Sequence, residues 1–225
     1  MTVSMLDRAI YSFGDVDRLV GLPAGTARRW LDGYERSGSR YEPVLREHSD
    51  GSAAVTWGEL VEARLLAEFR SRKVSMQRMR PAVAALRDEF GRYPLAHARP
   101  FLTVDNRELV RRMQDRLELD PDLSLVVVRN GQVVLSAAAE RFQHSVHYED
   151  DAVALIRPSA ATPDVTMDPA RSFGQPTVRG IRTDAIAEDF RAGSERDELV
   201  ELYDLTPTLV DQAIRFELIA ARDAA

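Results

Sequence analysis

The sequence predicts an α+β fold that is mainly α-helical, with an N-terminal winged helix-turn-helix, a small β-containing connector and a C-terminal three-helix domain of the helix-turn-helix kind. Three observations lead to this class. Apolar residues recur at helical spacing near both ends of the chain, strand-like runs and turn signals gather between them, and a Ser-, Ala-, Thr- and Pro-rich linker occupies residues 158–163. We expect domains at residues 1–95, 96–160 and 161–225.

The first domain contains a helix-turn-helix signature. Asp15 is placed to cap a first helix, Gly21-Leu22-Pro23 breaks that helix, and a second helix is expected from Ala24 or Gly25 through Trp30 to Gly33. In helix-turn-helix proteins the first turns of the second helix enter the major groove, where Arg binds guanine bidentately and Thr meets a base edge or a phosphate. This predicts DNA contacts at Thr26, Arg28 and Arg29. The alternative is an ordinary helical hairpin with solvated arginines and Trp30 in the core.

A wing is expected after the second helix. Two short runs, residues 40–45 and 53–56, flank the Gly-bearing segment 48–52, which predicts a β-hairpin. Thr56 and Glu59 have the spacing of a capping box, so a further helix is expected to begin there. Ser75 begins the next helix, where Pro81 is tolerated only near the first turn or at a kink.

This order of two helices, a wing and two following helices, with the aromatic residue of Arg28-Arg29-Trp30, resembles the MerR-type winged helix-turn-helix domain over roughly the first ninety residues. In that family the second helix enters the major groove and the wing touches phosphates. The resemblance implies DNA contacts at Thr26, Arg28, Arg29, Tyr34, Arg40 and Arg46. MerR-type regulators usually carry a long antiparallel coiled-coil helix for dimerisation, and this sequence has no heptad run of that length.

Charge is distributed unevenly along the chain. Residues 1–116 carry 20 basic and 16 acidic side chains, whereas residues 117–225 carry 10 and 20. The first half suits nucleic acid, and the acidic half suits a solvated surface or a basic protein partner. The sequence has no apolar run long enough for a bilayer and no signal-like N-terminus, so we expect a cytoplasmic protein without membrane contact. The lack of cysteine excludes disulfides and thiolate chemistry.

The connector between the two helical regions is expected to be α+β and to provide a dimer contact. Residues 101–104 and 108–110 flank Asp105-Asn106 as a hairpin, although the second run equally suits a helix to Leu117. Asn130-Gly131, between apolar runs at 123–128 and 132–135, is the strongest hairpin signal in the chain. A short helix at 137–142 and strands at 146–148 and 152–156 follow.

The last sixty residues carry a second motif series, which includes Met167-Asp168-Pro169, Gly174-Gln175-Pro176-Thr177-Val178 and Gly180-Ile181-Arg182-Thr183. This series is similar to the small helical family called domain of unknown function 433, with Gln175 where Lys is commoner. We expect a strand pair, a helix capped by Thr183 and two helices that start at Ser194 and Thr206. The expected trihelical core consists of Leu199, Leu202, Tyr203, Val210, Ala213, Ile214 and Leu218.

The two resemblances together imply a VapB-type antitoxin. Such a protein binds and silences a cognate PIN or PIN-like ribonuclease toxin, and as a homodimer it represses its own operon by binding operator double-stranded DNA. We expect no cofactor and no enzymatic activity. The alternative is a stand-alone MerR-like transcriptional regulator whose C-terminal half dimerises or senses a ligand.

Two further groups of residues are candidate sites. Arg179, Arg182 and Thr183 are candidates for a second DNA or partner contact, against the favoured alternative that Arg182 pairs with Asp184 or Asp168. His144 and His147, with the acidic residues 149–151, suggest a metal-dependent enzyme, but a solvated acidic turn with incidental histidines is favoured, so no metal is expected.

Overall fold

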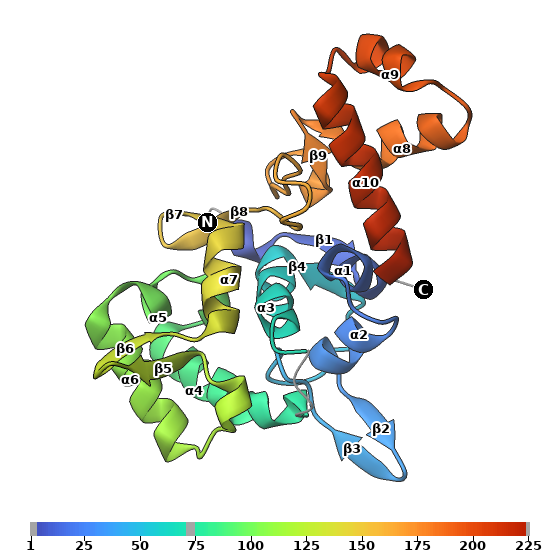
Figure 1. The fold of residues 1–225 in the computed structure, drawn as a ribbon. Coiled ribbons are helices and arrows are strands. Elements are labelled where there is room, and N and C mark those ends of the chain that lie inside the picture. The colour runs from blue at the N-terminus through green and yellow to red at the C-terminus, as the bar shows by residue number, and fades with distance from the viewer. Residues whose placement is uncertain (1–3, 71–74, 224–225) are drawn as a thin grey trace.

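The computed structural model describes residues 4–70 and 75–223. Figure 1 shows a central body, a two-stranded hairpin that projects from one end of it, and a C-terminal helical domain at the other end. Helices predominate, and every sheet in the described residues has two antiparallel strands. The fold is therefore α+β and mainly α, as the sequence predicts. No helix of the described residues is both long and apolar enough to cross a membrane.

A short 3-10 helix, η1 (Met5–Asp7), and a strand, β1 (Ala9–Ser12), come first in the N-terminal region. The two helices of the helix-turn-helix follow as α1 (Phe13–Val20) and α2 (Thr26–Leu31). The prediction that Asp15 caps the first helix is wrong by one turn. Ser12 is the cap, because its hydroxyl accepts a hydrogen bond from the Asp15 amide at 3.1 Å while the Asp15 carboxylate accepts one from the Ser12 amide at 2.8 Å. The second helix starts at Thr26, just after the expected Ala24 or Gly25, and ends at Leu31, two residues before the expected end at Gly33.

The wing lies earlier in the chain than the sequence pattern indicates. It consists of β2 (Tyr34–Arg36) and β3 (Ser39–Tyr41), joined by Ser37 and Gly38 with φ angles of 52° and 75°. The predicted pairing of residues 40–45 with 53–56 is wrong. Instead β4 (Ala54–Thr56) pairs with β1, and residues 44 and 45 turn back so that their amides donate to the Trp30 carbonyl at 2.8 and 3.0 Å.

The following helices agree with the sequence signals. The Thr56–Glu59 capping box opens α3 (Trp57–Ala67), and Ser75 precedes η2 (Met76–Met79). Pro81 lies in the first turn of α4 (Arg80–Phe90), where its missing N–H costs nothing. The short 3-10 helix η3 (Pro94–Ala96) then leads into the connector.

In the connector, the predicted hairpin around Asp105-Asn106 is wrong and the helical alternative is right. Thr103 separates α5 (Arg99–Leu102) from α6 (Val104–Arg116) and caps the second helix, because its hydroxyl accepts a hydrogen bond from the Asn106 amide at 3.1 Å. After η4 (Pro121–Leu123), the other expected elements are present, although the strand expected from Leu123 begins only at Val126. They are β5 (Val126–Arg129), β6 (Gln132–Leu135), α7 (Ala137–Ser145), β7 (Val146–Glu149) and β8 (Ala152–Ile156).

The C-terminal domain has the expected strand pair and three helices. Its elements are η5 (Ser172–Gly174), β9 (Thr177–Val178), β10 (Ile181–Arg182), α8 (Thr183–Arg191), α9 (Arg196–Tyr203) and α10 (Pro207–Asp223). Neither Thr183 nor Ser194 caps a helix. Thr183 is the first residue of α8 and its hydroxyl donates to Glu217 at 2.6 Å, whereas Glu195 forms the capping box of α9.

Two members of the expected core set of this domain are exposed instead of buried. Leu202 and Leu218 are 66% and 60% exposed, while Leu205 and Phe216 are buried. On α9 the side chains that pack into the core are Leu199, Val200 and Tyr203, and on α10 the buried ones include Val210, Ala213 and Phe216. Leu202 and Leu218 lie beside these two stripes. The trihelical core is therefore real, but its composition is only partly the predicted one.

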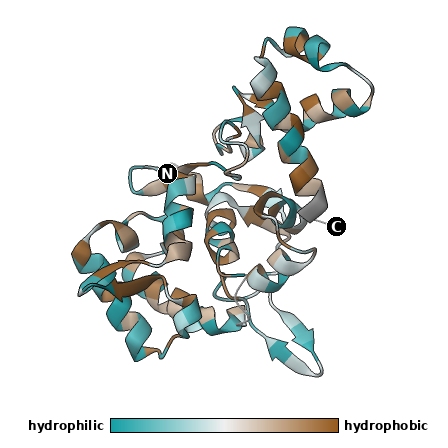
Figure 2. Ribbon diagram, viewed as in Figure 1, coloured by the Kyte–Doolittle hydropathy of each residue, from teal (hydrophilic) through white to brown (hydrophobic). Residues whose placement is uncertain are grey.

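The first two predicted domains share one apolar cluster. Buried side chains connect continuously from Leu6 through the α3 helix to Met167, and the Trp57 indole N–H donates to the Val153 carbonyl at 2.7 Å. A second, smaller cluster lies between α8, α9 and α10. In Figure 2 the wing ribbon is largely hydrophilic, in keeping with its position outside both cores. The boundaries at residues 95 and 160 stay predictions.

The C-terminal domain packs against the first helix of the helix-turn-helix. Three side chains of the N-terminal segment donate to it: Arg8 to the Pro169 carbonyl at 2.7 Å, Tyr11 to the Gly174 carbonyl at 2.8 Å and Arg18 to Gln175 at 3.0 Å. Arg18 also lies 3.6 Å from the Glu217 carboxylate on α10, which runs beside α1 in Figure 1. A lysine at position 175 would bring a second positive charge to Arg18, which gives Gln175 a structural role.

Candidate nucleic-acid interface

A buried carboxylate fixes the second helix of the helix-turn-helix. Gly25, with φ of 76°, precedes α2 and offers no side chain to cap it. Asp17 of α1 supplies the cap instead, because its two oxygens accept hydrogen bonds from the Gly25 and Ala27 amides at 2.7 Å each. A negative charge at a helix N-terminus is favourable, so this contact sets the orientation of α2 on α1.

The wing is held by a glycine and an aromatic pair. Gly33 links α2 to β2 with φ of 77°, and a Cβ atom at this position would lie 2.4 Å from the Tyr41 carbonyl oxygen. The Tyr34 and Tyr41 rings stack across the two strands with centroids 4.7 Å apart and an interplanar angle of 6°. Gly33 and the tyrosine pair therefore fix the orientation of the wing relative to α2, and the two elements together form one surface.

This surface gathers four of the six residues that the MerR resemblance implies. An open depression of about 490 Å³ lies between α2 and the wing, and Arg28, Arg29, Tyr34 and Arg40 line it together with Asp32, Gly33, Glu35 and Ser49. The Arg28 side chain is 70% exposed and its Nε lies 3.8 Å from Asp32, whose carboxylate also accepts a hydrogen bond from Ser49. Arg40 is exposed and pairs with Glu42 at 3.0 Å. Such exposed pairs are weak, so these guanidiniums remain available for phosphate or base edges.

Thr26 and Arg46 lie elsewhere. Thr26 is buried, and its hydroxyl accepts a hydrogen bond from Arg29 at 2.9 Å, so it orients Arg29. Arg46 is 9% exposed and donates to Glu59 at 2.7 and 3.1 Å. It also donates to Asp50 and to the Ser52 and Ala54 carbonyls.

Burial by itself lowers the pKa of Arg46, but the hydrogen bond to Glu59 and the negative charges of Glu59, Asp50 and Asp32 together outweigh this effect and raise it. We therefore correct the expectation of a DNA contact at Arg46, because this side chain is part of the buried interior of the domain. Sequence reasoning missed Arg36, an exposed arginine at the end of β2. The signal that would have located it is the pair of glycines, Gly33 and Gly38, on either side of the true wing.

Of the C-terminal candidates, Arg182 pairs with Asp184, which is the favoured alternative to a DNA or partner contact. Arg182 donates to Asp184 through both Nε, at 2.9 Å, and a terminal nitrogen, and this hydrogen bonding lowers the pKa of the Asp184 carboxyl. Thr183 is buried. Arg179 is exposed in the turn between β9 and β10 with φ of 49°, and its role as a second DNA or partner contact stays a prediction.

The two histidines do not share a helix face. His144 is in the last turn of α7, whereas His147 lies in β7 opposite Leu155. Across residues 4–70 and 75–223, no group of three or more His, Asp or Glu side chains is arranged to hold a metal ion. The two histidines whose spacing suggested a metal site therefore lie on different elements, one on a helix and the other on a strand.

Comparisons with known proteins agree with this arrangement. Residues 9–83 match the family described as "Putative DNA-binding HTH domain", and residues 165–216 match "Protein of unknown function (DUF433)". The chain is 42% identical over 221 residues to "Uncharacterized protein Rv2308" of Mycobacterium tuberculosis, with 95% of this chain and 92% of that protein covered.

The chain is also 31% identical over 225 residues to "Putative antitoxin VapB45" of the same organism, with 92% and 93% covered. Among solved structures, the crystal structure of Rv2018 from M. tuberculosis superposes with a TM-score of 0.74 at 27% identity, over 95% of this chain and 99% of that one. The similarity to these proteins thus extends over nearly the whole chain and includes both helical domains.

Proposed function

We propose that this protein is an antitoxin. The chain belongs to the family of helix-turn-helix and DUF433 proteins that includes Rv2308 and the putative antitoxin VapB45, and the proposal starts from this membership. It binds and neutralises a cognate PIN or PIN-like ribonuclease toxin, and as a homodimer it represses its own operon. The similarity to VapB45 supports the antitoxin part of this proposal. The geometry of α2 and the wing supports the DNA-binding part.

The observation that carries the DNA-binding proposal is the convergence of Arg28, Arg29, Tyr34 and Arg40 on one open surface. In this arrangement α2 enters the major groove with Arg28 and Arg29 toward the base edges, while the wing follows the backbone with Arg36 and Arg40 toward phosphates. Asp17 holds α2 in position for this reading, since it fixes the helix N-terminus from inside the fold.

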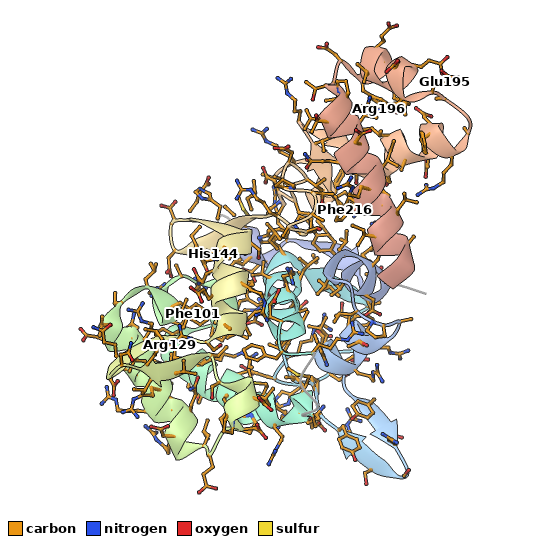
Figure 3. All side chains as sticks on the ribbon, in the orientation of Figure 1. Phe101, Arg129, His144, Glu195, Arg196 and Phe216 are labelled. Atoms are coloured by element: carbon orange, nitrogen blue, oxygen red, sulfur yellow. The ribbon has the colours of Figure 1, made fainter. Side chains whose placement is uncertain are left out.

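We place the toxin-binding surface on the C-terminal helices. Residues 183–223 contain eleven acidic and four basic side chains, which suits a partner whose RNA-binding surface is basic. On α9 the carboxylates of Asp197 and Glu201 are exposed one turn apart, next to the exposed Leu202. Figure 1 shows α9 and the wing at opposite ends of the molecule, and Figure 3 marks the start of α9 at Glu195 and Arg196. This separation allows DNA and toxin to bind at the same time.

The DNA-binding part is tested with the double substitution Arg28→Ala and Arg29→Ala. We expect the affinity for the DNA upstream of its own gene to fall at least about a hundredfold and the slope of log affinity against log salt to decrease by about 2. Arg112→Ala with Arg116→Ala is the matched control, because it removes the same charge from exposed positions of α6. Equal losses in the two double variants would contradict the assignment of α2 as the reading helix.

The antitoxin part is tested by co-expression with the product of the neighbouring gene, followed by a pull-down and a growth-rescue assay. The Arg28→Ala, Arg29→Ala protein is expected to co-purify with the toxin and to rescue growth as the wild type does. Loss of both DNA binding and rescue in this variant would contradict the division of functions. If the wild-type chain neither co-purifies nor rescues, the protein is a stand-alone regulator with a dimerising or ligand-sensing C-terminal half.

A further inference from the structure

A cationic pocket lies where three segments of the chain meet, away from the α2 and wing surface. It has a volume of about 560 Å³ and is bounded by the end of α3, the end of α7 and the segment 157–163 that leads to the C-terminal domain. Its charged lining consists of Arg64 and Glu68 from α3, Arg141 and His144 from α7, and Arg157 after β8. Figure 3 marks the position of His144 on α7.

The positive charges in this pocket exceed the negative ones. Glu68 is the one acidic residue among the described residues that line it, and both of its oxygens are engaged: Arg64 donates to one at 2.7 Å and Arg141 to the other at 2.8 Å. Three guanidiniums therefore face one carboxylate. This excess lies largely in the half of the chain that is otherwise strongly acidic, where residues 117–225 carry 10 basic and 20 acidic side chains.

Two of the arginines have unused hydrogen-bonding capacity. The Nε atom of Arg64 is buried, and none of the described residues offers it a hydrogen-bond acceptor. Arg157 has no carboxylate within 4.0 Å in the described part of the chain, although its main-chain amide is fixed by a hydrogen bond to the Ser145 carbonyl at 2.7 Å. A buried donor without an acceptor costs free energy, and an anion in the pocket would supply one.

We propose that this pocket binds a small molecule that carries a phosphate group. Arginine is the side chain best suited to phosphate, because its planar guanidinium donates two parallel hydrogen bonds to an oxyanion. A bound dianion would balance the excess charge of Arg64, Arg141 and Arg157, and the pocket volume lies within the range that small ligands occupy. Because its walls come from α3, α7 and the segment 157–163, the ligand bridges the helix-turn-helix body and the start of the C-terminal domain.

The proposal is tested by calorimetric titration of the full chain with inorganic pyrophosphate, with the ionic strength matched by NaCl. We expect saturable binding by the wild type and at least a tenfold loss of affinity in Arg157→Ala. Within residues 4–70 and 75–223 the Arg157 guanidinium makes no hydrogen bond or ion pair, so this variant is expected to retain the wild-type thermal midpoint. Arg129→Ala is the matched control, because Arg129 is also an exposed arginine at the end of a strand and lies away from the pocket (Figure 3). Its affinity for pyrophosphate should stay within twofold of the wild type.

Three results would overturn the proposal. The first is the absence of saturable pyrophosphate binding by the wild type at millimolar concentration. The second is equal affinity in Arg157→Ala and Arg129→Ala. The third is that Arg28→Ala with Arg29→Ala abolishes pyrophosphate binding, or that Arg157→Ala weakens operator binding, because either result would assign the anion to the DNA-binding surface.

Discussion

The contact between the C-terminal domain and the helix-turn-helix depends on a glycine. Gly174 has φ of 69°, and a Cβ atom built there would lie 1.9 Å from the Tyr11 hydroxyl oxygen, which donates its hydrogen bond to the Gly174 carbonyl. Tyr11 is 4% exposed and its ring lies 6.3 Å from that of Trp57, so it cannot easily move aside. Gly174→Ala should therefore displace Tyr11 and separate the two domains locally.

Gly180→Ala provides a matched control for the backbone. Gly180 has φ of 84°, and a Cβ atom there would have nothing within 4 Å. Both substitutions pay about 1–2 kcal/mol for an alanine in the left-handed region. Gly174→Ala should cost about 1–3 kcal/mol more, since it leaves the buried Tyr11 hydroxyl without its acceptor.

Scanning calorimetry measures this difference. For a chain of this size, an extra 2 kcal/mol corresponds to a midpoint roughly 4–8 °C below that of Gly180→Ala. In the double variant Gly174→Ala, Tyr11→Phe the oxygen that clashes with the new methyl group is absent, so part of the loss should be recovered. Equal midpoints for the two alanine variants would refute the reasoning, because they would mean that Tyr11 and Gly174 are not in contact.

Three further predictions concern the helix-turn-helix body. Arg46→Ala should lower the free energy of unfolding by about 3–5 kcal/mol, because it leaves the buried Glu59 charge and backbone carbonyls unpaired. Substitution of the exposed Arg36 by alanine should change this free energy by less than about 0.5 kcal/mol. Chemical denaturation compares the two variants, and similar small losses would mean that Arg46 is not buried. Burial raises the pKa of Glu62 to about 8, so the folded state binds one more proton than the unfolded state from about pH 5 to pH 8 and stability falls with rising pH. Glu62→Gln should remove up to about 1.4 kcal/mol per pH unit of that slope, and parallel stability profiles for the two proteins would contradict this. Gly33→Ala should weaken operator binding at least tenfold, since its methyl group displaces the wing, whereas Gly38→Ala should leave the wing in place, because a Cβ atom there has no neighbour within 4 Å. Fluorescence anisotropy with labelled operator measures both affinities, and wild-type affinity in Gly33→Ala would contradict the role of the wing.

Several signals that act over a few residues predict the local structure correctly, although the caps expected at Asp15 and Thr183 do not form. The capping box of Thr56 and Glu59, the Asn130-Gly131 turn and the helix break at Gly21-Leu22-Pro23 each depend on groups within four positions of one another. The same holds for the order of helices in the C-terminal domain. The sequence also indicates Arg28, Arg29, Tyr34 and Arg40 as candidates, because they lie in or just after a locally recognisable second helix.

The sequence by itself thus determined the fold class, the two helical regions and most of the candidate DNA-binding arginines, because helix caps, turns and periodicity are local properties. The tertiary structure alone decided where the wing lies and which arginines are free. The strand at residues 54–56 pairs with β1, more than forty residues earlier, and Arg46 is buried because Glu59 and two carbonyls converge on it. Strand pairing and burial depend on partners distant in sequence, and nothing within a few residues of Arg46 distinguishes a core guanidinium from one that reads DNA.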